Sequence, residues 1–222
     1  MSDTQPEKRK PDASSLPRLP DGRVDWDAMW HDQITPWDMG KPSPPLVAWL
    51  KAGALPKGRR VLLPGCGRAY EARLLAEAGY EPVGVDLCGL AVEEARTQLA
   101  DIAGATIIQA DVIADIARIA ETPFDWAFDQ TFFCALEPRD RAPSARAMAR
   151  ALRPGGELWA LTFQVGTPDG PPYHTDAREY ADIHIAAGFE EIEIRKLDIE
   201  SHTPRQGRET LVRLRRGDSM RA

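Results

Sequence analysis

The sequence predicts an α/β protein built around a doubly wound, mostly parallel, seven-stranded sheet with an antiparallel strand at one edge. From Arg59 onward, short runs rich in Val, Leu and Ile alternate with Ala-, Leu- and Glu-rich segments that have helical periodicity. Strands that alternate with helices imply right-handed crossovers and parallel neighbours. The last two β-rich segments are joined by a Pro/Gly loop alone, so we expect them to pair antiparallel at one edge.

The individual elements follow from the same patterns. The runs that predict strands are RRVLLP at 59–64, PVGVD at 82–86, ATIIQAD at 105–111, FDWAFDQ at 124–130, ELWALTFQV at 157–165, EEIEIRKLD at 190–198 and ETLVRLRR at 209–216. Helices are expected at 70–78, 90–100, 114–120, 138–152 and 177–187. Gly79 and Gly188 are placed to end two of these helices.

Length and composition limit the possible functions. The 222 residues suffice for one sizeable domain, and the net charge of −6 argues against a nucleic-acid partner. The chain has no apolar run of about 18 residues and no apolar leader segment, which argues against a membrane or secretory protein. The three cysteines lack CxxC spacing, so we expect neither a metal site nor a disulfide framework. The expectation is a cytoplasmic monomer with a small-molecule partner.

The N-terminal part precedes the alternating pattern. Residues 1–22 are rich in Pro, Ser and charge, and they predict a flexible tail before a single domain at 23–218. The segment 23–52 contains four tryptophans, of which Trp26 and Trp30 would share one helix face. The prolines of PSPP break the chain before a short helix at about 46–52.

The stretch VLLPGCGRAY indicates a ligand-binding turn. Gly65 and Gly67 follow the first strand, where an open parallel sheet binds its ligand and where a missing side chain lets the backbone approach it. Asp86 ends the second strand and can accept hydrogen bonds from ribose hydroxyls, while Asp111 ends the third strand, near the place of an adenine amino group. Tyr70 stands where a dinucleotide fingerprint has a small residue.

These features favour S-adenosylmethionine over a dinucleotide. That molecule has adenine and ribose but no phosphate, and its positive sulfonium prefers acids and aromatic faces. A tight strand-to-helix turn without a ligand is the alternative, and the acids that end two strands argue against it. An NAD-type oxidoreductase is a more distant alternative.

Several longer stretches resemble the thiopurine S-methyltransferase family, most closely its halide/thiocyanate (thiol) methyltransferase branch. They are WDAMWHDQITPWDMGKPSP, VLLPGCGRAYEA, GYEPVGVDLC, the ADV triplet, FDQTFFCALEPRDRAP, LRPGGELWALTF, DGPPY and HTPRQGRETL, in order over about residues 24–212. The resemblance implies a class I methyltransferase (Rossmann-like) fold and an S-adenosylmethionine cofactor. The segment 23–52 would then fold back as a lid over that cofactor.

The resemblance also implies site residues. The expected cofactor-binding residues are Trp26, Trp30, Trp37, Gly65, Cys66, Gly67, Asp86, Leu87, Asp111, Val112, Asp129 and Gln130. Two positions depart from plant relatives: Gln130 replaces a common Tyr, and Phe163-Gln164 replaces Tyr-Pro. For Cys66, a small buried residue in a tight turn is favoured over a reactive thiol.

The expected reaction is an in-line displacement at the sulfonium methyl by a small soft nucleophile: a thiol, hydrosulfide, thiocyanate or halide. Such an anion already carries its lone pair, so no general base is required, and alignment and removal of water supply the catalysis. The expected acceptor pocket consists of Trp37, Phe132, Phe133, Phe163 and Tyr173. Phe132 and Phe133 would alternate on a strand end, so that one of them packs in the core. The alternatives are methylation of thiopurines or other aromatic thiols, and a cofactor-binding protein without turnover.

Overall fold

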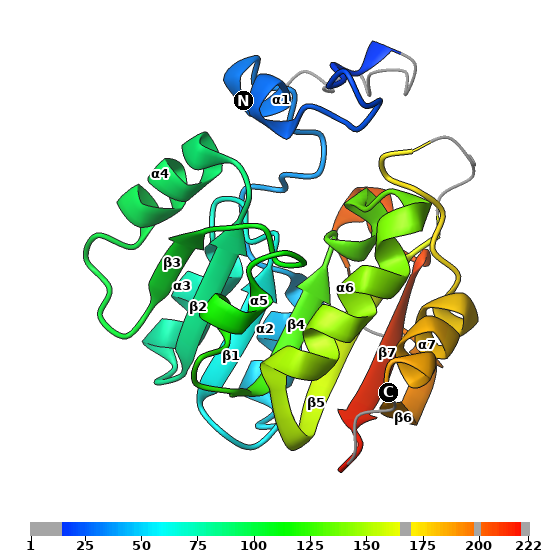
Figure 1. The fold of residues 1–222 in the computed structure, drawn as a ribbon. Helices are drawn as coiled ribbons and strands as arrows, with labels where there is room; N and C mark the ends of the chain where they lie inside the picture. Colours follow the sequence, from blue (N-terminus) through cyan, green and yellow to red (C-terminus); the bar gives the residue numbers. More distant parts are fainter. Residues whose placement is uncertain (1–14, 165–169, 198–200, 219–222) are drawn as a thin grey trace.

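The computed structural model describes residues 15–164, 170–197 and 201–218, which form a seven-stranded sheet in the order β3-β2-β1-β4-β5-β7-β6 (Figure 1). The strands are β1 (Arg60–Pro64), β2 (Glu81–Asp86), β3 (Thr106–Gln109), β4 (Phe124–Gln130), β5 (Leu152–Phe163), β6 (Phe189–Lys196) and β7 (Glu209–Arg216). Strands β1 to β5 pair in parallel, and β7 runs antiparallel between β5 and β6. The predicted α/β fold and the antiparallel pairing of the last two strands are therefore confirmed.

Helices cover both faces of the sheet. They are α1 (Trp26–His31), α2 (Pro44–Lys51), α3 (Tyr70–Glu77), α4 (Gly89–Gln98), α5 (Ile116–Ile119), α6 (Pro138–Ala151) and α7 (Ala177–Ala186), with 3-10 turns η2 (Phe133–Ala135) and η3 (Thr203–Arg205). Helices α2, α3 and α4 pack on an apolar cluster that contains Trp126 and Trp159, whereas α5, α6 and α7 pack on a second cluster around Phe124. The two clusters form the double-sided core that a parallel sheet requires.

Strand β5 begins earlier than expected. The sequence predicts a helix to residue 152 and a strand from 157, but α6 ends at Ala151 and β5 starts at Leu152. Leu152 pairs with Phe124, and the register then shifts before Trp126. Gly155 supplies a positive φ of 72° within this irregular stretch, which is why the RPGG sequence resembles a turn although it lies inside the strand.

Residues 15–22, the described part of the predicted N-terminal tail, make contacts with the segment that follows them. Leu16 is 6% exposed and packs with Val24 and Met29, and Arg18 forms an isolated antiparallel bridge with Val24. These contacts hold residues 15–22 in place. They could not be predicted from the polar composition of this stretch, because the apolar partners of Leu16 lie beyond it. Residues 1–14 of the predicted tail lie outside the described residues.

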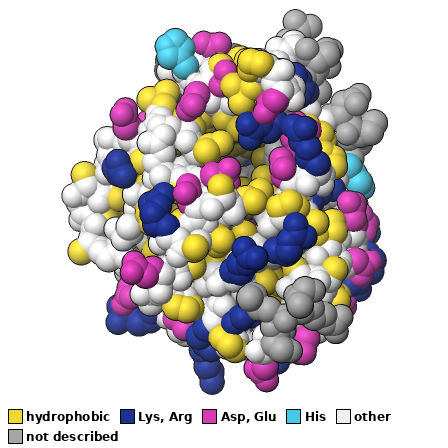
Figure 2. Space-filling model, viewed as in Figure 1, with side chains coloured by type: hydrophobic (Ala, Val, Ile, Leu, Met, Phe, Trp, Pro, Cys, Tyr) yellow, Lys and Arg dark blue, Asp and Glu magenta, His cyan; other side chains and the backbone are white. Residues whose placement is uncertain are grey.

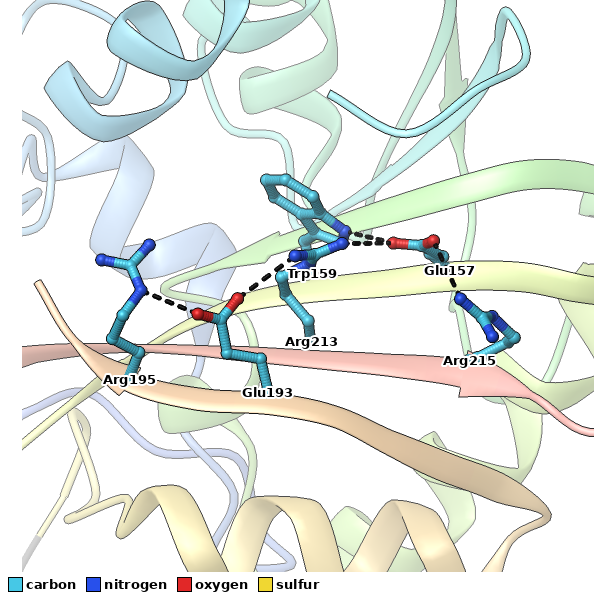
Figure 3. Close-up of polar contacts among 6 residues, drawn as sticks. All are labelled: Glu157, Trp159, Glu193, Arg195, Arg213 and Arg215. Carbon is cyan, nitrogen blue, oxygen red and sulfur yellow. Dashed lines mark hydrogen bonds and ion pairs between the residues drawn. The ribbon is translucent and has the colours of Figure 1, made fainter. Parts of the chain in front are cut away.

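The outer part of the sheet carries a ladder of charged side chains on β5, β7 and β6 (Figure 3). Arg213 lies between Glu157 and Glu193, and its guanidinium group stacks 4.5 Å from the Trp159 ring centroid. Figure 2 shows acidic, basic and apolar side chains interspersed over the face viewed. In the described part of the chain, no helix is both long enough and apolar enough to cross a membrane.

Candidate functional site

The glycine turn lies at the carboxyl end of β1. Gly65 and Gly67 have φ values of 58° and 50°, in the left-handed region that favours glycine. A Cβ atom at Gly65 would lie 3.0 Å from the Phe132 side chain, and one at Gly67 would lie 3.6 Å from Trp30. The turn therefore needs glycine for its backbone conformation, and at Gly65 for space as well.

Cys66 faces into the sheet rather than toward a ligand. Its N–H donates to the carbonyl oxygen of Val85 over 3.1 Å, and its Sγ would lie 2.8 Å from a Cβ placed on Gly84. Burial, and then the charge of Asp86, raise the pKa of the thiol well above its ordinary value. These contacts indicate that Cys66 packs the turn against β2 and is a poor nucleophile.

Asp86 ends β2 directly beside the turn. Its Oδ2 accepts the Gly67 N–H over 2.9 Å, and its Oδ1 accepts the Cys88 N–H over 3.0 Å. Burial raises the pKa of this carboxyl, and the nearby charge of Asp27 raises it further. The Leu87 N–H is a third backbone donor to this carboxylate, which retains capacity for a further donor such as a hydroxyl group. Leu87 follows Asp86, and 52% of its surface is exposed, so it presents an apolar surface directly after β2.

Asp111 and Val112 follow β3. Asp111 Oδ1 accepts the N–H groups of Ile113 over 2.7 Å and of Ala114 over 3.2 Å, so its side chain shapes the turn that leads to α5. Val112 is buried in the core that α5 and α6 share. The structure thus brings the ends of β1, β2 and β3 together, with one predicted acid at each of the latter two.

The charges of this end fit a cationic cofactor and oppose a phosphate. In a dinucleotide site, backbone N–H groups of the glycine turn face the pyrophosphate. Here Asp86 occupies the Gly67 N–H, and Glu71 places a carboxylate in the first turn of α3. Asp27 adds a third acid near Asp86. The carboxylates of Asp86 and Asp27 would repel a phosphate and attract a sulfonium, while Arg205 partly offsets the charge of Glu71.

Three tryptophans lie together beside the turn. Asp25 caps α1 by accepting the Ala28 N–H over 2.9 Å. Trp30 on this helix is 4% exposed and packs against Cys88 and Ala91 at the start of α4. Trp37 makes edge contacts with Trp26 and Trp30, at centroid distances of 5.4 Å and 6.3 Å.

The segment that carries these tryptophans lies at the end of the molecule where the parallel strands end (Figure 1). Helix α1 contacts α4, and the Trp30 side chain lies over Gly67. The fourth tryptophan, Trp49, is buried against Trp159 in the α2 core.

The predicted acceptor residues near β4 divide into two groups. Strand β4 ends at Gln130 and the chain turns at Thr131, which has a φ of 64°. The expectation that Phe132 and Phe133 alternate on a strand end is therefore wrong, because the chain leaves the sheet and Phe133 begins η2. Phe133 is buried in the α6–α7 core, whereas Phe132 is partly exposed and touches the Gly65 position.

Asp129 points into the protein at the end of β4. It is 5% exposed, its Oδ2 accepts the Tyr180 hydroxyl over 3.0 Å, and its Oδ1 accepts the Phe133 N–H over 3.3 Å. Burial raises the pKa of this carboxyl to about 6. A cavity of about 10 Å³ adjoins it, lined by Asp129, Thr131, Phe133, Cys134, Ala160, Leu161, Thr162, Phe163, Thr175 and Tyr180. This space holds about one water molecule.

Tyr173 lies on the loop that follows the GPP sequence, where the Gly170–Pro171 and Pro171–Pro172 peptide bonds are cis. Its N–H donates to the Cys134 carbonyl over 2.7 Å, which ties the loop to η2. Burial and a hydrogen bond to Glu137 raise the pKa of the Tyr173 hydroxyl. The hydroxyl is therefore engaged with the start of α6.

A buried polar chain around Gln130 is the feature that the sequence did not reveal. With its amide oriented to satisfy both neighbours, the Gln130 nitrogen donates to Glu71 Oε1 over 3.1 Å and its oxygen accepts from Arg205 over 3.0 Å. Glu71 Oε1 also accepts the Ser43 N–H over 2.9 Å. Arg205 donates to the Trp37 carbonyl over 2.8 Å.

Glu71 and Arg205 stand within the stretches GRAYEA and HTPRQGRETL, which carry the family resemblance but do not indicate the partners of these residues. Arg141, a further missed residue, is buried at the start of α6. It donates to Glu179 and to the His174 carbonyl, and its guanidinium lies 5.0 Å from the Phe133 ring centroid. Arg141 therefore joins α6 to Phe133 and to the loop that contains His174.

Comparisons with known proteins identify the family of the chain. The family model described as Thiopurine S-methyltransferase (TPMT) matches residues 22–218. Probable thiol methyltransferase 2 of Arabidopsis thaliana is 36% identical over 196 residues, which cover 87% of this chain and 85% of that protein. Thiocyanate methyltransferase 1 of Brassica oleracea is 34% identical over 192 residues, with 85% and 83% covered.

Among solved structures, one from work on the conversion of a disulfide bond into a thioacetal group during echinomycin biosynthesis has a TM-score of 0.73 and 27% identity, with 87% of this chain and 92% of that chain covered. The family match extends over the glycine turn, the strand-end acids and the tryptophan segment alike. The chain belongs to the thiopurine S-methyltransferase family and is an S-adenosylmethionine-dependent methyltransferase.

Proposed function

We propose that this enzyme methylates a small soft nucleophile: a thiol, hydrosulfide, thiocyanate or halide. The observation that carries the proposal is the placement of three aromatic rings by separate contacts: Trp37 packs on Trp30, Phe132 touches the Gly65 position of the glycine turn, and Phe163 lies 5.9 Å from the Arg205 guanidinium. Aromatic walls favour polarizable, weakly hydrated acceptors over small hard anions, whose hydration is costly to remove. The printed names of the thiol and thiocyanate relatives support the same acceptor class.

The proposed cofactor site uses the carboxyl ends of β1, β2 and β3. Bound there, S-adenosylmethionine supplies a methyl group on a positive sulfonium. Gly65 and Gly67 allow close approach of the backbone, Asp86 accepts hydroxyl groups of the ribose, and Leu87 offers an apolar surface to the adenine. The remaining residues proposed to line this site are Trp26, Trp30, Trp37, Asp111 and Val112.

Some residues of the expected site have other partners in the fold. Cys66 packs under the turn, Asp129 is bonded to Tyr180, and Gln130 bridges Glu71 and Arg205. We propose supporting roles for these three, in which they fix the floor and wall of the site.

The proposed chemistry needs no general base when the acceptor is an anion. The acceptor's lone pair forms a bond to the methyl carbon while the bond from that carbon to the sulfonium sulfur breaks, so no proton moves. Asp129 is held by Tyr180 and by the Phe133 N–H, which suits a structural role. The protein contributes alignment and exclusion of water, to which residues 23–52 contribute as a lid.

Acceptor assays test this proposal. The enzyme is incubated with S-adenosylmethionine and iodide, thiocyanate, hydrosulfide or an alkyl thiol, and headspace gas chromatography measures the methylated product. A thiopurine and thiophenol form a second panel, because the family name raises aromatic thiols as the alternative. Product from the first panel above a heat-killed control supports the proposal, while product from aromatic thiols alone supports the alternative. No product from any acceptor, with tight cofactor binding by calorimetry, would leave a binding protein without turnover.

Assembly and location are separate expectations. We propose a cytoplasmic monomer, to which the three free cysteines are suited because a reducing compartment keeps thiols unpaired. Size-exclusion chromatography with light scattering tests the oligomeric state.

A further inference from the structure

Two arginines from distant parts of the chain converge on Trp37 and Asp38. Arg205, in the turn before β7, donates a guanidinium N–H to the Trp37 carbonyl over 2.8 Å. Arg68, directly after the glycine turn, pairs with the Asp38 carboxylate. The two contacts fall on adjacent residues, and they connect this point of the N-terminal segment to two separate parts of the sheet's carboxyl end.

Arg205 is itself held firmly. It is 6% exposed, it donates to the Gln130 side-chain oxygen over 3.0 Å, and its Nη1 lies 3.8 Å from Glu209 Oε1. Its guanidinium lies 5.9 Å from the Phe163 ring centroid. Gln130 ends β4, Phe163 ends β5 and Glu209 begins β7. The planar guanidinium therefore holds the Trp37 carbonyl at a fixed position relative to these strands.

Arg68 is held by α4 and α1 in a comparable way. Its Nε lies 2.6 Å from Glu94 Oε2, and its guanidinium stacks 4.8 Å from the Trp30 ring centroid. Asp38 Oδ1 accepts the Gly40 N–H over 2.8 Å, which leaves Oδ2 for the arginine. The carboxylate is therefore oriented by its own loop before it meets Arg68.

Both contacts lie on one loop, residues 33–40, which has a residue with positive φ at each end. Gln33 and Gly40 have φ values of 55° and 69°, and the Trp37 ring between them is only partly buried. Trp30, on the other hand, is anchored in a buried cluster with α4. The position of Trp37 thus depends more on polar contacts than the position of Trp30 does.

We propose that Arg205 and Arg68 form an arginine clamp, which positions Trp37 over the cofactor site and slows the escape of bound cofactor. The inference rests on the proposed function, in which residues 23–52 cover the cofactor. Both arginines act through Trp37 and Asp38, so they are positioning residues. Weakening the clamp should lower affinity for the cofactor product S-adenosylhomocysteine and raise KM for S-adenosylmethionine, with a smaller effect on kcat at saturation.

The test compares Arg205→Gln with Arg213→Gln in the full-length enzyme. Arg213 is a control because, like Arg205, it pairs with glutamate and lies near an aromatic ring (Figure 3), but it contacts β5 and β6 instead of the N-terminal segment. Calorimetry with S-adenosylhomocysteine should show affinity at least about ten-fold weaker in Arg205→Gln, as expected for loss of a charge-assisted hydrogen bond. Arg213→Gln should bind like the wild type, and Arg205→Lys should recover part of the loss.

Hydrogen–deuterium exchange of the cofactor-free enzyme gives an independent measurement. Faster exchange in residues 33–40 of Arg205→Gln, without a change in the peptides of β1 and β4, supports the clamp. If Arg205→Gln does not fold, Asp38→Asn decides instead, because the amide oxygen keeps the Gly40 contact but loses the charge that pairs with Arg68. Folded variants that bind and exchange like Arg213→Gln would overturn the clamp. A wild type that methylates no acceptor would defeat the proposed function, while the binding and exchange measurements would still decide the clamp.

Discussion

Replacing Asp129 with asparagine isolates the energetic cost of a buried carboxylate in the core beneath the site. Burial raises the pKa of Asp129 to about 6, from an ordinary value of 3.8 in an exposed chain. The folded state therefore binds this proton more tightly than the unfolded state does. Ionisation at neutral pH costs stability, and the wild type regains that stability as the pH falls through about 6 toward 3.8.

The magnitude follows from proton linkage. Between about pH 7.5 and about pH 4.5, the raised pKa increases the stability of the wild type by about 2 kcal/mol relative to a protein without this titration. Asparagine keeps an oxygen for the Tyr180 hydroxyl or the Phe133 N–H but has no charge. The free energy of unfolding of Asp129→Asn minus that of the wild type should therefore decrease by about 2 kcal/mol when the pH is lowered across this range.

Urea unfolding of both proteins at both pH values measures the effect. The quantity of interest is the change with pH in the difference between their free energies of unfolding. His184 and His202, whose pKa values are lowered to about 4 by burial, lose stability on acidification in both proteins and so cancel. Asp101→Asn is a control without this pH dependence: the hydrogen bond from Arg73 lowers the pKa of Asp101, so this carboxyl titrates below the pH range used and its stability difference from the wild type should stay nearly constant. If the stability difference between Asp129→Asn and the wild type stays constant with pH, the burial argument for Asp129 is refuted.

Three further outcomes are expected. Trp37→Ala should weaken S-adenosylhomocysteine binding by about 1–3 kcal/mol in calorimetry, through loss of an aromatic contact, and unchanged affinity would contradict the lid. Gly65→Ala should lower the free energy of unfolding by about 1–3 kcal/mol in urea titration, because of its positive φ and its 3.0 Å approach to a neighbouring side chain; full stability would show that the turn relaxes freely. Native thiols should react slowly with iodoacetamide at neutral pH, since burial raises the pKa of Cys88 to about 11 and that of Cys134 to about 12, and rapid labelling by mass spectrometry would contradict their burial.

The architecture was predictable because it depends on periodic properties of the sequence. Apolar runs such as VLLP and the strand-end acid Asp86 have a fixed relation to the sheet, so their order alone places Gly67 next to Asp86. The prediction was wrong where local signals compete. The RPGG sequence has the composition of a turn, yet β5 continues through it after pairing Leu152 with Phe124. Leu16 is an isolated apolar residue, and its burial depends on the three-dimensional position of Met29.

The contacts around Trp37 lay beyond sequence reasoning for a different reason. Arg205 donates to a main-chain carbonyl 168 positions away, and every residue carries such a carbonyl, so no residue type identifies the acceptor. Gln130 illustrates the same limit: compared with plant relatives it is a missing aromatic ring, but in the fold its amide joins Glu71 to Arg205. A substitution that looks like a loss of cofactor contact can thus exchange a ring for a polar link that runs from α3 through Arg205 to the Trp37 carbonyl. Residue identity at such a position constrains function only together with the partners that the fold supplies.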